Sequence, residues 1–334
     1  MSFTRLLTLF NMKKRVMIMS FLGDTPVIKI RYRLDGKESL IYAKREFLNP
    51  SGSVKDRIVR YIMDRAQERG ELKPGQPIVE VTSGNTGIAF SAIGARRGHP
   101  VHIFMPSWAS DERKNLMRMY GATLHEVTRE EQGFKGAFVQ ADKLAAEIGA
   151  YMPRQFENED NINAHRFGTG AEIIKQIPDV TDFVSGFGTG GTIIGIGKAL
   201  KEYNPDIRVT ALEPDALPLL SGGEIRGDGS HKIEGIGDDF IPDIIQNNRS
   251  VIDDIVQIND DDAVCMAAMI ARNLGIGVGI SSGANFLASV MKDAPEHKVV
   301  TVFADDNKKY LTTSLANPQP APYMLSSRIE LIDG

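Results

Sequence analysis

The sequence predicts an α/β protein made of two three-layer α/β domains, each with a mainly parallel sheet, with a cleft between them. Short apolar runs typical of buried strands alternate with amphipathic helical patterns over residues 78–148 and again over residues 182–303. Alternation of this kind favours parallel sheets covered by helices on both faces. A chain of 334 residues is also long enough for two domains of ordinary size.

The first half of the chain opens with a hairpin pattern and then changes to strand–helix alternation. A helix is predicted from near Lys55 to Gly70, because apolar residues recur there at every fourth position. Ser53 is the expected N-cap of this helix. Strands are predicted over residues 27–30, 40–44, 78–81, 101–105 and 123–127. Further helices are predicted over residues 85–97, 111–120 and 134–148.

The second half repeats the alternation around a long loop. Strands are predicted over residues 182–185, 207–212 and 299–303, and helices over residues 168–177, 192–203, 260–274 and 284–292. Residues 214–235 are rich in Gly, Pro and Ser, which indicates a long functional loop. A turn is expected at residues 279–283, and the proline-containing chain after Leu315 is expected to lie on the surface.

The expected domain organisation follows from these elements. It consists of an N-terminal extension (1–20), an N-terminal segment that packs with the C-terminal domain (21–55), a smaller N-terminal α/β domain (56–155), a larger C-terminal α/β domain (156–315) and a tail (316–334). The basic and apolar start of the chain imitates a signal peptide, but no small-residue cleavage site follows it.

Composition excludes several classes of function. A formal net charge of −4 gives no electrostatic footprint for nucleic acid, and no apolar run is long enough to span a membrane. The single cysteine rules out an intrachain disulfide, and the six histidines show no spacing typical of a metal site. We therefore expect a cytoplasmic protein that has no metal site and does not bind nucleic acid or span a membrane.

Lys55 is the first candidate for chemistry. It lies in the first turn of its predicted helix, where the helix dipole disfavours a cation. A destabilised ammonium group has a lowered pKa and favours the neutral amine, which can attack a carbonyl carbon. The alternative is a solvated lysine on an amphipathic helix, as most helix lysines are.

Two glycine-rich turns are predicted at strand-to-helix junctions, where open parallel sheets bind ligands. The first, Thr-Ser-Gly-Asn-Thr-Gly at 82–87, offers hydroxyl, carboxamide and backbone N–H groups that suit a carboxylate or another anion. The alternative for this turn is ordinary helix capping.

The second turn, Gly-Phe-Gly-Thr-Gly-Gly-Thr at 186–192, has the glycine content and the following helix of a phosphate cradle. It also satisfies the GxGxxG pattern, with Glu213 about 20 residues further on, so a nicotinamide-dinucleotide site is a rival interpretation.

Six motifs in one order carry a resemblance to a known family. They are NPSGSVKDR at 49–57, TSGNTG at 82–87, QFEN at 155–158, GFGTGGT at 186–192, EGIG at 234–237 and GISSG at 279–283. Over roughly residues 20–315 the chain resembles the cysteine synthase and cystathionine β-synthase family, pyridoxal-phosphate enzymes of fold type II. A dinucleotide enzyme would need neither Lys55 nor the turn at 82–87.

The resemblance implies roles for individual residues. Lys55 is expected to form the Schiff base with pyridoxal 5'-phosphate and later to move the Cα proton. Asn85 is expected to bind the phenolic oxygen of the cofactor, and Ser281 its pyridine nitrogen. The phosphate is expected to be held by Gly188, Thr189, Gly190, Gly191 and Thr192. The substrate is expected to be bound by Thr82, Ser83, Asn85, Thr86, Gln155 and Gly235. The resemblance also implies a homodimer.

Asp238 departs from the family pattern. Cysteine synthases usually carry small residues after the Gly-Ile-Gly at 235–237, and cystathionine β-synthases usually carry Tyr-Asp-Phe, so Asp238 matches neither. A carboxylate with an ordinary pKa of about 3.9 can accept a proton from water. We therefore predict that Asp238 directs water to Cβ. The alternative is that Asp238 faces solvent or caps a turn.

The predicted function is β-elimination and β-replacement at Cβ of L-cysteine, or of an activated serine, through an α-aminoacrylate intermediate. The preferred reaction is L-cysteine plus water giving L-serine and hydrogen sulfide. Within the family the alternatives are O-acetylserine sulfhydrylase activity and thiol addition of the cystathionine β-synthase type. Outside it, the alternatives are a nicotinamide-dependent oxidoreductase and a non-catalytic binding protein.

Overall fold

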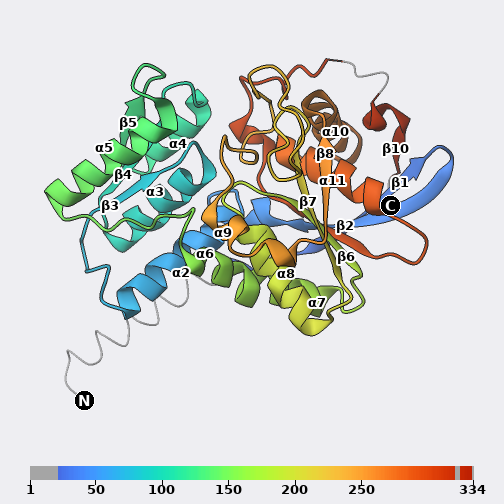
Figure 1. The fold of residues 1–334 in the computed structure, drawn as a ribbon, viewed down its shortest axis with the longest axis horizontal. Coiled ribbons are helices and arrows are strands. Elements are labelled where there is room, and N and C mark those ends of the chain that lie inside the picture. Colours follow the sequence, from blue (N-terminus) through green and yellow to red (C-terminus); the bar gives the residue numbers. More distant parts are fainter. Residues whose placement is uncertain (1–21, 320–323, 333–334) are drawn as a thin grey trace.

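The computed structural model describes residues 22–319 and 324–332, so the predictions for residues 1–20 lie outside the described part of the chain. Its described strands form two sheets, one in each of two lobes (Figure 1). One sheet has three strands and the other has seven. The predicted α/β class with mainly parallel sheets is confirmed.

Most strands lie on the predicted apolar runs, whereas the two hairpin strands predicted over residues 27–30 and 40–44 are each four residues longer than predicted. The described strands are β1 (Val27–Leu34), β2 (Lys37–Arg45), β3 (Ile78–Val81), β4 (Val101–Pro106), β5 (Thr123–Val127), β6 (Asp182–Gly186), β7 (Arg208–Pro214), β8 (Asp254–Ile258), β9 (Val299–Phe303) and β10 (Ile329–Ile332). The three-stranded sheet has the order β3-β4-β5, and the seven-stranded sheet has the order β10-β1-β2-β9-β6-β7-β8. The α-helices are α2 (Lys55–Glu68), α3 (Asn85–Arg97), α4 (Asp111–Met119), α5 (Gly133–Ile148), α6 (Glu159–Ala164), α7 (Ala171–Gln176), α8 (Gly191–Tyr203), α9 (Asp243–Gln246), α10 (Asp260–Leu274) and α11 (Ile280–Lys292).

The small lobe is a parallel sheet with helices on both faces. Residues of β3 alternate in direction: Ile78 packs in a cluster with α2 and α3, whereas Val79 and Val81 pack in a cluster with α5. Because both faces are covered, every residue of β3 is buried and the strand is apolar except for Glu80.

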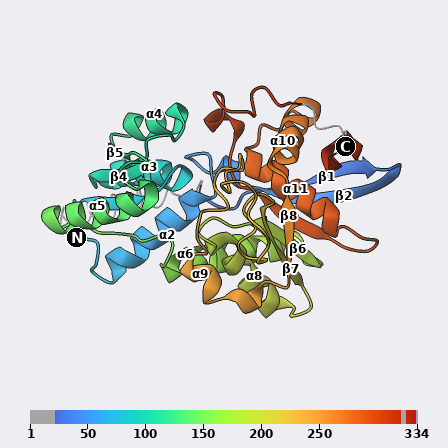
Figure 2. The ribbon, with the colours of Figure 1, turned by 45° about the horizontal axis from the view of Figure 1, so that its top comes forward.

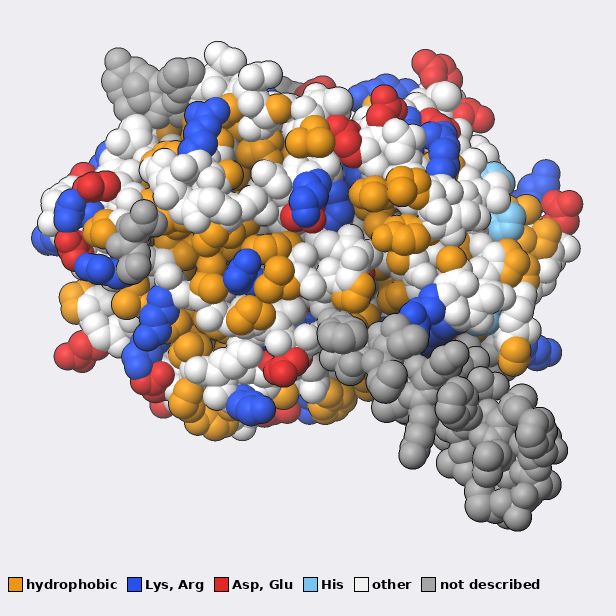
Figure 3. All heavy atoms as spheres, turned by 180° about the vertical axis from the view of Figure 1, so that it is seen from behind, with side chains coloured by type: hydrophobic (Ala, Val, Ile, Leu, Met, Phe, Trp, Pro, Cys, Tyr) orange, Lys and Arg blue, Asp and Glu red, His pale blue; other side chains and the backbone are white. Residues whose placement is uncertain are grey.

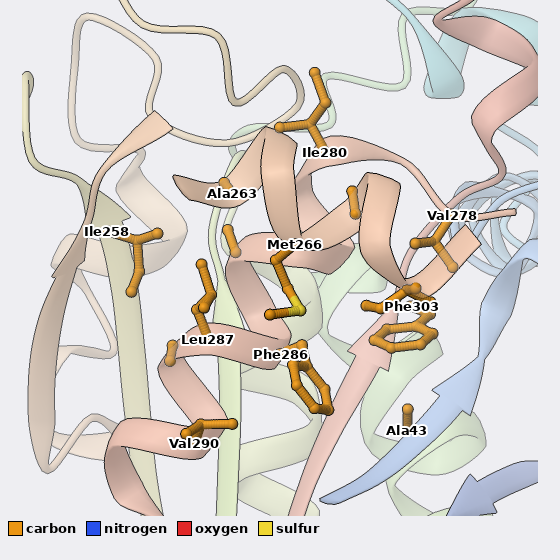
Figure 4. Close-up of a cluster of buried hydrophobic side chains, with 14 of the residues drawn as sticks. Ala43, Ile258, Ala263, Met266, Val278, Ile280, Phe286, Leu287, Val290 and Phe303 are labelled. Carbon is orange, nitrogen blue, oxygen red and sulfur yellow. The ribbon is translucent and has the colours of Figure 1, made fainter. Parts of the chain in front are cut away.

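The large lobe has the same layering around a longer sheet. Phe183 of β6 packs on the side of α7 and α8, and the next residue, Val184, packs on the side of α10 and α11. Figure 2 shows these helix pairs on opposite faces of the sheet. In Figure 4, Met266 of α10 and Phe286 and Leu287 of α11 lie together above the strands.

The ends of the described chain meet at one edge of the large sheet. The antiparallel hairpin β1–β2 adds to β9 in parallel, and β10 pairs antiparallel with β1. The expectation of surface chain after Leu315 is therefore wrong for Ile329–Ile332, in which Ile329 and Leu331 are buried. Their burial depends on pairing with β1, which lies some three hundred residues away in the sequence, so no local pattern predicts it.

Helix starts also differ from the prediction. Helix α2 begins at Lys55 with Val54 as its N-cap, so Ser53 lies one position too early to cap it. Helix α11 begins at Ile280, which places most of the predicted turn at 279–283 inside the first helical turn. Small polar residues are tolerated there because the first N–H groups of a helix have no intrahelical partner.

The predicted helix 168–177 is the last part of a longer helical stretch. Helix α6 leads into a π-helical turn at His165–Gly170 and then into α7. Strand β8 was not predicted from the sequence.

None of the helices in the described part of the chain has the length and the apolar character that a membrane span requires.

Candidate active site

The cleft between the two lobes is lined by nearly all predicted site residues. They come from the start of α2, the turn after β3, the linker between the lobes, the turn after β6, the long loop 215–242 and the start of α11. The residues in question are Lys55, Thr82, Ser83, Asn85, Thr86, Gln155, Gly188, Thr189, Gly190, Thr192, Gly235, Asp238 and Ser281. Gly191 is buried but does not line the cleft.

Lys55 is the first residue of α2, and its backbone N–H donates to Ser53 Oγ at 3.2 Å. Its ammonium group makes no hydrogen bond within the described part of the chain. Burial lowers the pKa of Lys55, and the negative charges of Asp305 and Asp238 oppose that shift. The structure therefore holds an amine with a reduced preference for the charged form, facing the cleft.

The turn at residues 82–87, which we call the first loop, joins β3 to α3. The hydroxyl of Thr86 donates to Gln155 Oε1 at 2.7 Å, and the Gln155 amide donates to the carbonyl of Val81 at 3.0 Å. The Asn85 amide donates to Asp305 Oδ2 at 2.8 Å. These bonds fix the side chains of the first loop around the start of a helix, where backbone N–H groups attract an anion.

The turn at residues 186–192, which we call the second loop, joins β6 to α8. A Cβ atom on Gly188 would lie 2.5 Å from the backbone oxygen of Gly235, and Gly190 has a φ of +88°. Neither position accepts a side chain without a shift of the backbone. The loop thus exposes bare backbone at the N-terminus of a helix, which suits a phosphate.

Asp238 lies in the same cleft, beside the second loop. Its carboxylate would be 4.0 Å from a Cβ atom on Gly188, and the side chain is half-buried. Burial raises the pKa of Asp238 to about 6, with a further contribution from the charge of Asp239, while Lys55 acts in the opposite direction. The neighbouring Asp239 is exposed.

Ser281 lies in the first turn of α11 and lines the cleft. It is 6% exposed, and its hydroxyl makes no hydrogen bond within the described residues. A buried hydroxyl without a hydrogen bond can donate one to a ring nitrogen of a ligand in the cleft.

Sequence reasoning missed Asp305. This fully buried carboxylate accepts hydrogen bonds from Asn85 and from the Tyr310 hydroxyl, at 2.8 Å each, and its Oδ1 atom has no partner in the described chain. It is the foremost negative charge acting on Lys55. The only sequence signal was its position two residues after the end of β9, at a strand end where open parallel sheets bind ligands.

Sequence reasoning also missed an ion pair that bridges the two lobes. Arg113 of α4 pairs with Glu234 of the long loop, and its guanidinium group lies 4.9 Å from the ring centroid of Tyr310. Arg113 also packs against Gly84, where a Cβ atom would approach its side chain to 3.1 Å. Both partners line the cleft.

The residues of the cleft fit pyridoxal phosphate. An amine without a hydrogen bond is present at Lys55, and Asn85 Oδ1 is buried without a partner among the described residues. The second loop offers a cradle that a Cβ atom on Gly188 would fill. Within the described residues, no group of side chains could hold a metal ion.

Comparisons with known proteins agree with this fit. The family model described as "Pyridoxal-phosphate dependent enzyme" matches residues 18–305. A cysteine synthase of Staphylococcus aureus (strain Mu50 / ATCC 700699) is 42% identical over 303 residues, which cover 89% of this chain and 96% of the relative.

Two solved structures are similar over almost the whole chain. The hydrogen sulfide-producing enzyme Fn1055 from Fusobacterium nucleatum is 43% identical, with a TM-score of 0.90 and coverage of 96% of this chain and 98% of that one. An aspartate-to-asparagine mutant of Fn1055, in its lysine-dimethylated form and in complex with an α-aminoacrylate intermediate, gives a TM-score of 0.91, with the same identity and coverage.

These matches decide between the two interpretations of the second loop. The GxGxxG pattern at 186–191 belongs to a pyridoxal-phosphate enzyme and is not a dinucleotide fingerprint. The chain therefore belongs to the pyridoxal-phosphate-dependent enzymes, and within them to the cysteine synthase family.

Proposed function

We propose that this enzyme converts L-cysteine and water into L-serine and hydrogen sulfide. The observation that carries the proposal is a carboxylate, Asp238, in the same cleft as Lys55 and beside the second loop, with a pKa of about 6. In this reaction the Cβ–S bond breaks, a Cβ–O bond forms, and one proton of water ends on the departing sulfur.

Lys55 acts on the Cα proton of the substrate. When bound, the cofactor withdraws electrons from Cα and makes this proton acidic. A neutral Lys55 amine takes the proton, and burial favours the neutral form by lowering the pKa. The second loop would hold the phosphate, and Asn85 and Ser281 would bind the cofactor ring.

The first loop would bind the substrate carboxylate. Thr82, Ser83 and Thr86 present hydroxyl groups at the start of α3, and Gln155 orients Thr86. Gly235, on the opposite lobe, would contact the substrate through its backbone. This arrangement fixes Cα and Cβ between Lys55 and Asp238.

Asp238 then acts as the general base toward water. A pKa of about 6 leaves the carboxylate ionised at neutral pH, yet close enough to that pH to accept a proton efficiently. As the water oxygen bonds to Cβ, its proton passes to the carboxylate. The negative charge also repels hydrosulfide and carboxylate-bearing nucleophiles, which disfavours the competing additions.

The relative supports the involvement of an aspartate. The Fn1055 mutant that holds α-aminoacrylate has lost one aspartate carboxylate. Such a complex is expected if an aspartate serves the addition of water to Cβ.

The test is a product assay with the holoenzyme and L-cysteine as sole substrate in H₂¹⁸O. Sulfide and an equimolar amount of L-serine labelled in its hydroxyl group are expected. Asp238→Asn should lower serine formation at least tenfold, as expected for loss of a general base. An unchanged rate of serine formation by Asp238→Asn would reject the proposed role, and pyruvate or lanthionine as the main product would reject the reaction.

O-acetylserine sulfhydrylase activity is the second candidate, because the curated relatives named cysteine synthase are 42% identical. The same protein should be assayed with O-acetylserine and sulfide. Faster cysteine synthesis than serine formation would favour this candidate and leave Asp238 without the role given above.

We further propose a cytoplasmic homodimer. Among the described residues, five large hydrophobic side chains are more than half exposed, namely Met119 at 82%, Val139 at 71%, Leu311 at 63%, Phe167 at 60% and Tyr203 at 51%. Figure 3 shows hydrophobic side chains gathered over the middle of the face opposite to that of Figure 1. Light scattering on the purified holoenzyme should give twice the chain mass, and a monomer mass at micromolar concentration would contradict the proposal.

A further inference from the structure

We propose that Asn161 is a positioning residue that directs the hydroxyl proton of Thr189 toward the cofactor phosphate and ties the two loops together. Asn161 lies in α6, outside every motif that predicted the site, and is 1% exposed. The inference rests on the proposed assignment of Gly188 to Thr192 to the phosphate.

The Asn161 amide bridges the linker between the lobes and the second loop. Its Nδ2 atom donates to the backbone oxygen of Gln155 at 2.8 Å and to Thr189 Oγ1 at 2.9 Å. An amide nitrogen carries two N–H groups, and both are used in these bonds.

The orientation of this amide is fixed by its neighbours. A backbone carbonyl oxygen can only accept a hydrogen bond, so the group that faces Gln155 O must be the NH₂ group of Asn161 and not its oxygen. The same NH₂ group faces Thr189, which therefore receives a hydrogen bond from Asn161.

This bond determines what Thr189 can do. A hydroxyl oxygen has two lone pairs and one proton. Thr189 Oγ1 accepts from Asn161 Nδ2 and, at 3.4 Å, from the backbone N–H of Gly191. With both lone pairs engaged, the proton is left to be donated, and Thr189 lines the cleft. Asn161 therefore turns Thr189 into a dedicated donor for an anion.

Gln155 extends the same network to the first loop. Its side chain accepts from Thr86, while its backbone N–H donates to the buried carboxyl of Glu80 at 3.3 Å. The chain of bonds Thr86–Gln155–Asn161–Thr189 thus crosses from the small lobe to the large lobe. A displacement of Asn161 disturbs both the phosphate side and the carboxylate side of the cleft.

Asn161 also explains why residue 191 is a glycine. A Cβ atom at Gly191 would lie 1.8 Å from Asn161 Oδ1, although Gly191 itself does not line the cleft. The absence of a side chain at this position makes room for the amide behind the loop rather than for a ligand in front of it.

The test compares Asn161→Asp with Asn161→Ala through the dissociation constant of pyridoxal phosphate, measured by reconstitution of the apoprotein, and through the ³¹P spectrum of the bound cofactor. The aspartate is isosteric, but its carboxylate accepts the Thr189 proton. We expect affinity to fall roughly 10- to 100-fold, the cost of a lost hydrogen bond to a charged group, with a shifted ³¹P signal. The alanine leaves the Thr189 proton free and should weaken binding less.

Two controls separate this role from a general loss of structure. Thermal unfolding of each apoprotein reports folding independently of the cofactor. Thr189→Val removes the hydroxyl, and in that background Asn161→Asp should weaken cofactor binding at most slightly further. An equal effect of Asn161→Asp with and without Thr189, or a larger effect of alanine than of aspartate, would overturn the inference.

The controls also distinguish the underlying assumptions. If Thr189→Val alone leaves the dissociation constant of pyridoxal phosphate unchanged, the phosphate assignment is wrong, and the inference falls with it. If the enzyme makes no serine from cysteine, the proposed reaction fails, but the cofactor-affinity measurements still decide the role of Asn161.

Discussion

The first and second loops share one design and differ in what they present. Each follows a buried parallel strand and opens a helix of 13 residues that borders the cleft. The first loop presents polar side chains, Thr82, Ser83, Asn85 and Thr86. The second presents mainly backbone, because Gly188 has no room for a side chain and Gly190 has a positive φ, and it adds the hydroxyl groups of Thr189 and Thr192.

The difference matches the two kinds of ligand proposed. A substrate enters and leaves at every turnover, and side chains on a loop can form and release hydrogen bonds with it. A cofactor phosphate stays bound, so it is served by fixed backbone N–H groups at a helix start and by a Thr189 hydroxyl that Asn161 already holds, with little side-chain entropy to lose.

The support behind each loop differs as well. Behind the first loop, Glu80 is a buried carboxyl whose pKa burial raises to about 8. Behind the second loop stand the neutral amide of Asn161 and His165, whose Nε2 lies 3.2 Å from Thr192 Oγ1. Burial lowers the pKa of His165 well below its ordinary value, so the ring is neutral. Of these three supporting groups, Glu80 is the one whose pKa lies near neutral pH.

Adding one methyl group to each loop should give the largest difference in cofactor binding between the two loops. Gly188→Ala forces the backbone of Gly235 to move, and we expect pyridoxal-phosphate affinity to fall about 100-fold, since overpacking costs up to about 3 kcal/mol. In the matched variant Gly84→Ala, the three atoms nearest to the new Cβ atom belong to the Arg113 side chain, which can shift, so this variant should retain the cofactor. Cofactor absorbance after dialysis measures both, and equal retention would contradict the distinction.

A pH profile tests the carboxylate beside the second loop. Serine formation should fall about fivefold between pH 6 and pH 5, because protonation of Asp238, whose pKa is about 6, removes the base. Asp239→Asn removes a charge that raises this pKa, so the acid limb should move to lower pH while activity at neutral pH remains. An acid limb that persists unchanged in Asp238→Asn would assign it to another group.

Thr86→Val should affect the substrate and leave the cofactor in place. The change removes the hydroxyl that bonds to Gln155, and we expect the KM for cysteine to rise about three- to tenfold, the value of one hydrogen bond. The dissociation constant of pyridoxal phosphate should stay the same. A variant in which both constants rise together would show that the two loops are not functionally separate.

Glu80→Gln should have the smallest effect on catalysis, and its effect should be visible in stability. Because the folded-state pKa of Glu80 is raised from 4.5 to about 8, its stabilising contribution is complete at low pH and is lost as pH rises through that window. The free energy of unfolding of Glu80→Gln should therefore fall less steeply between about pH 4.5 and about pH 8 than that of the wild type. Identical slopes in denaturant titrations would contradict the raised pKa.

Local patterns predicted the elements whose signals are short-range. Strands β3, β5 and β9 and helices α3 and α10 have the predicted bounds, because apolar runs and turn residues mark them on both sides. The stretch Glu159–Ala164 carries no apolar period, and its helix went unpredicted. Strand β10 depends on pairing with β1, which no local signal reports.

By itself, the sequence determined the layered α/β architecture and placed Lys55 and both glycine-rich loops at strand-to-helix junctions. Periodicity and turn chemistry act over a few residues, so they can be recognised without knowing the fold. Only the tertiary structure brought Asp305 to Asn85, Arg113 to Glu234 and Asn161 to Thr189. Each of these contacts joins segments far apart in the chain, and long-range packing, which leaves no periodic signal, decides their partners.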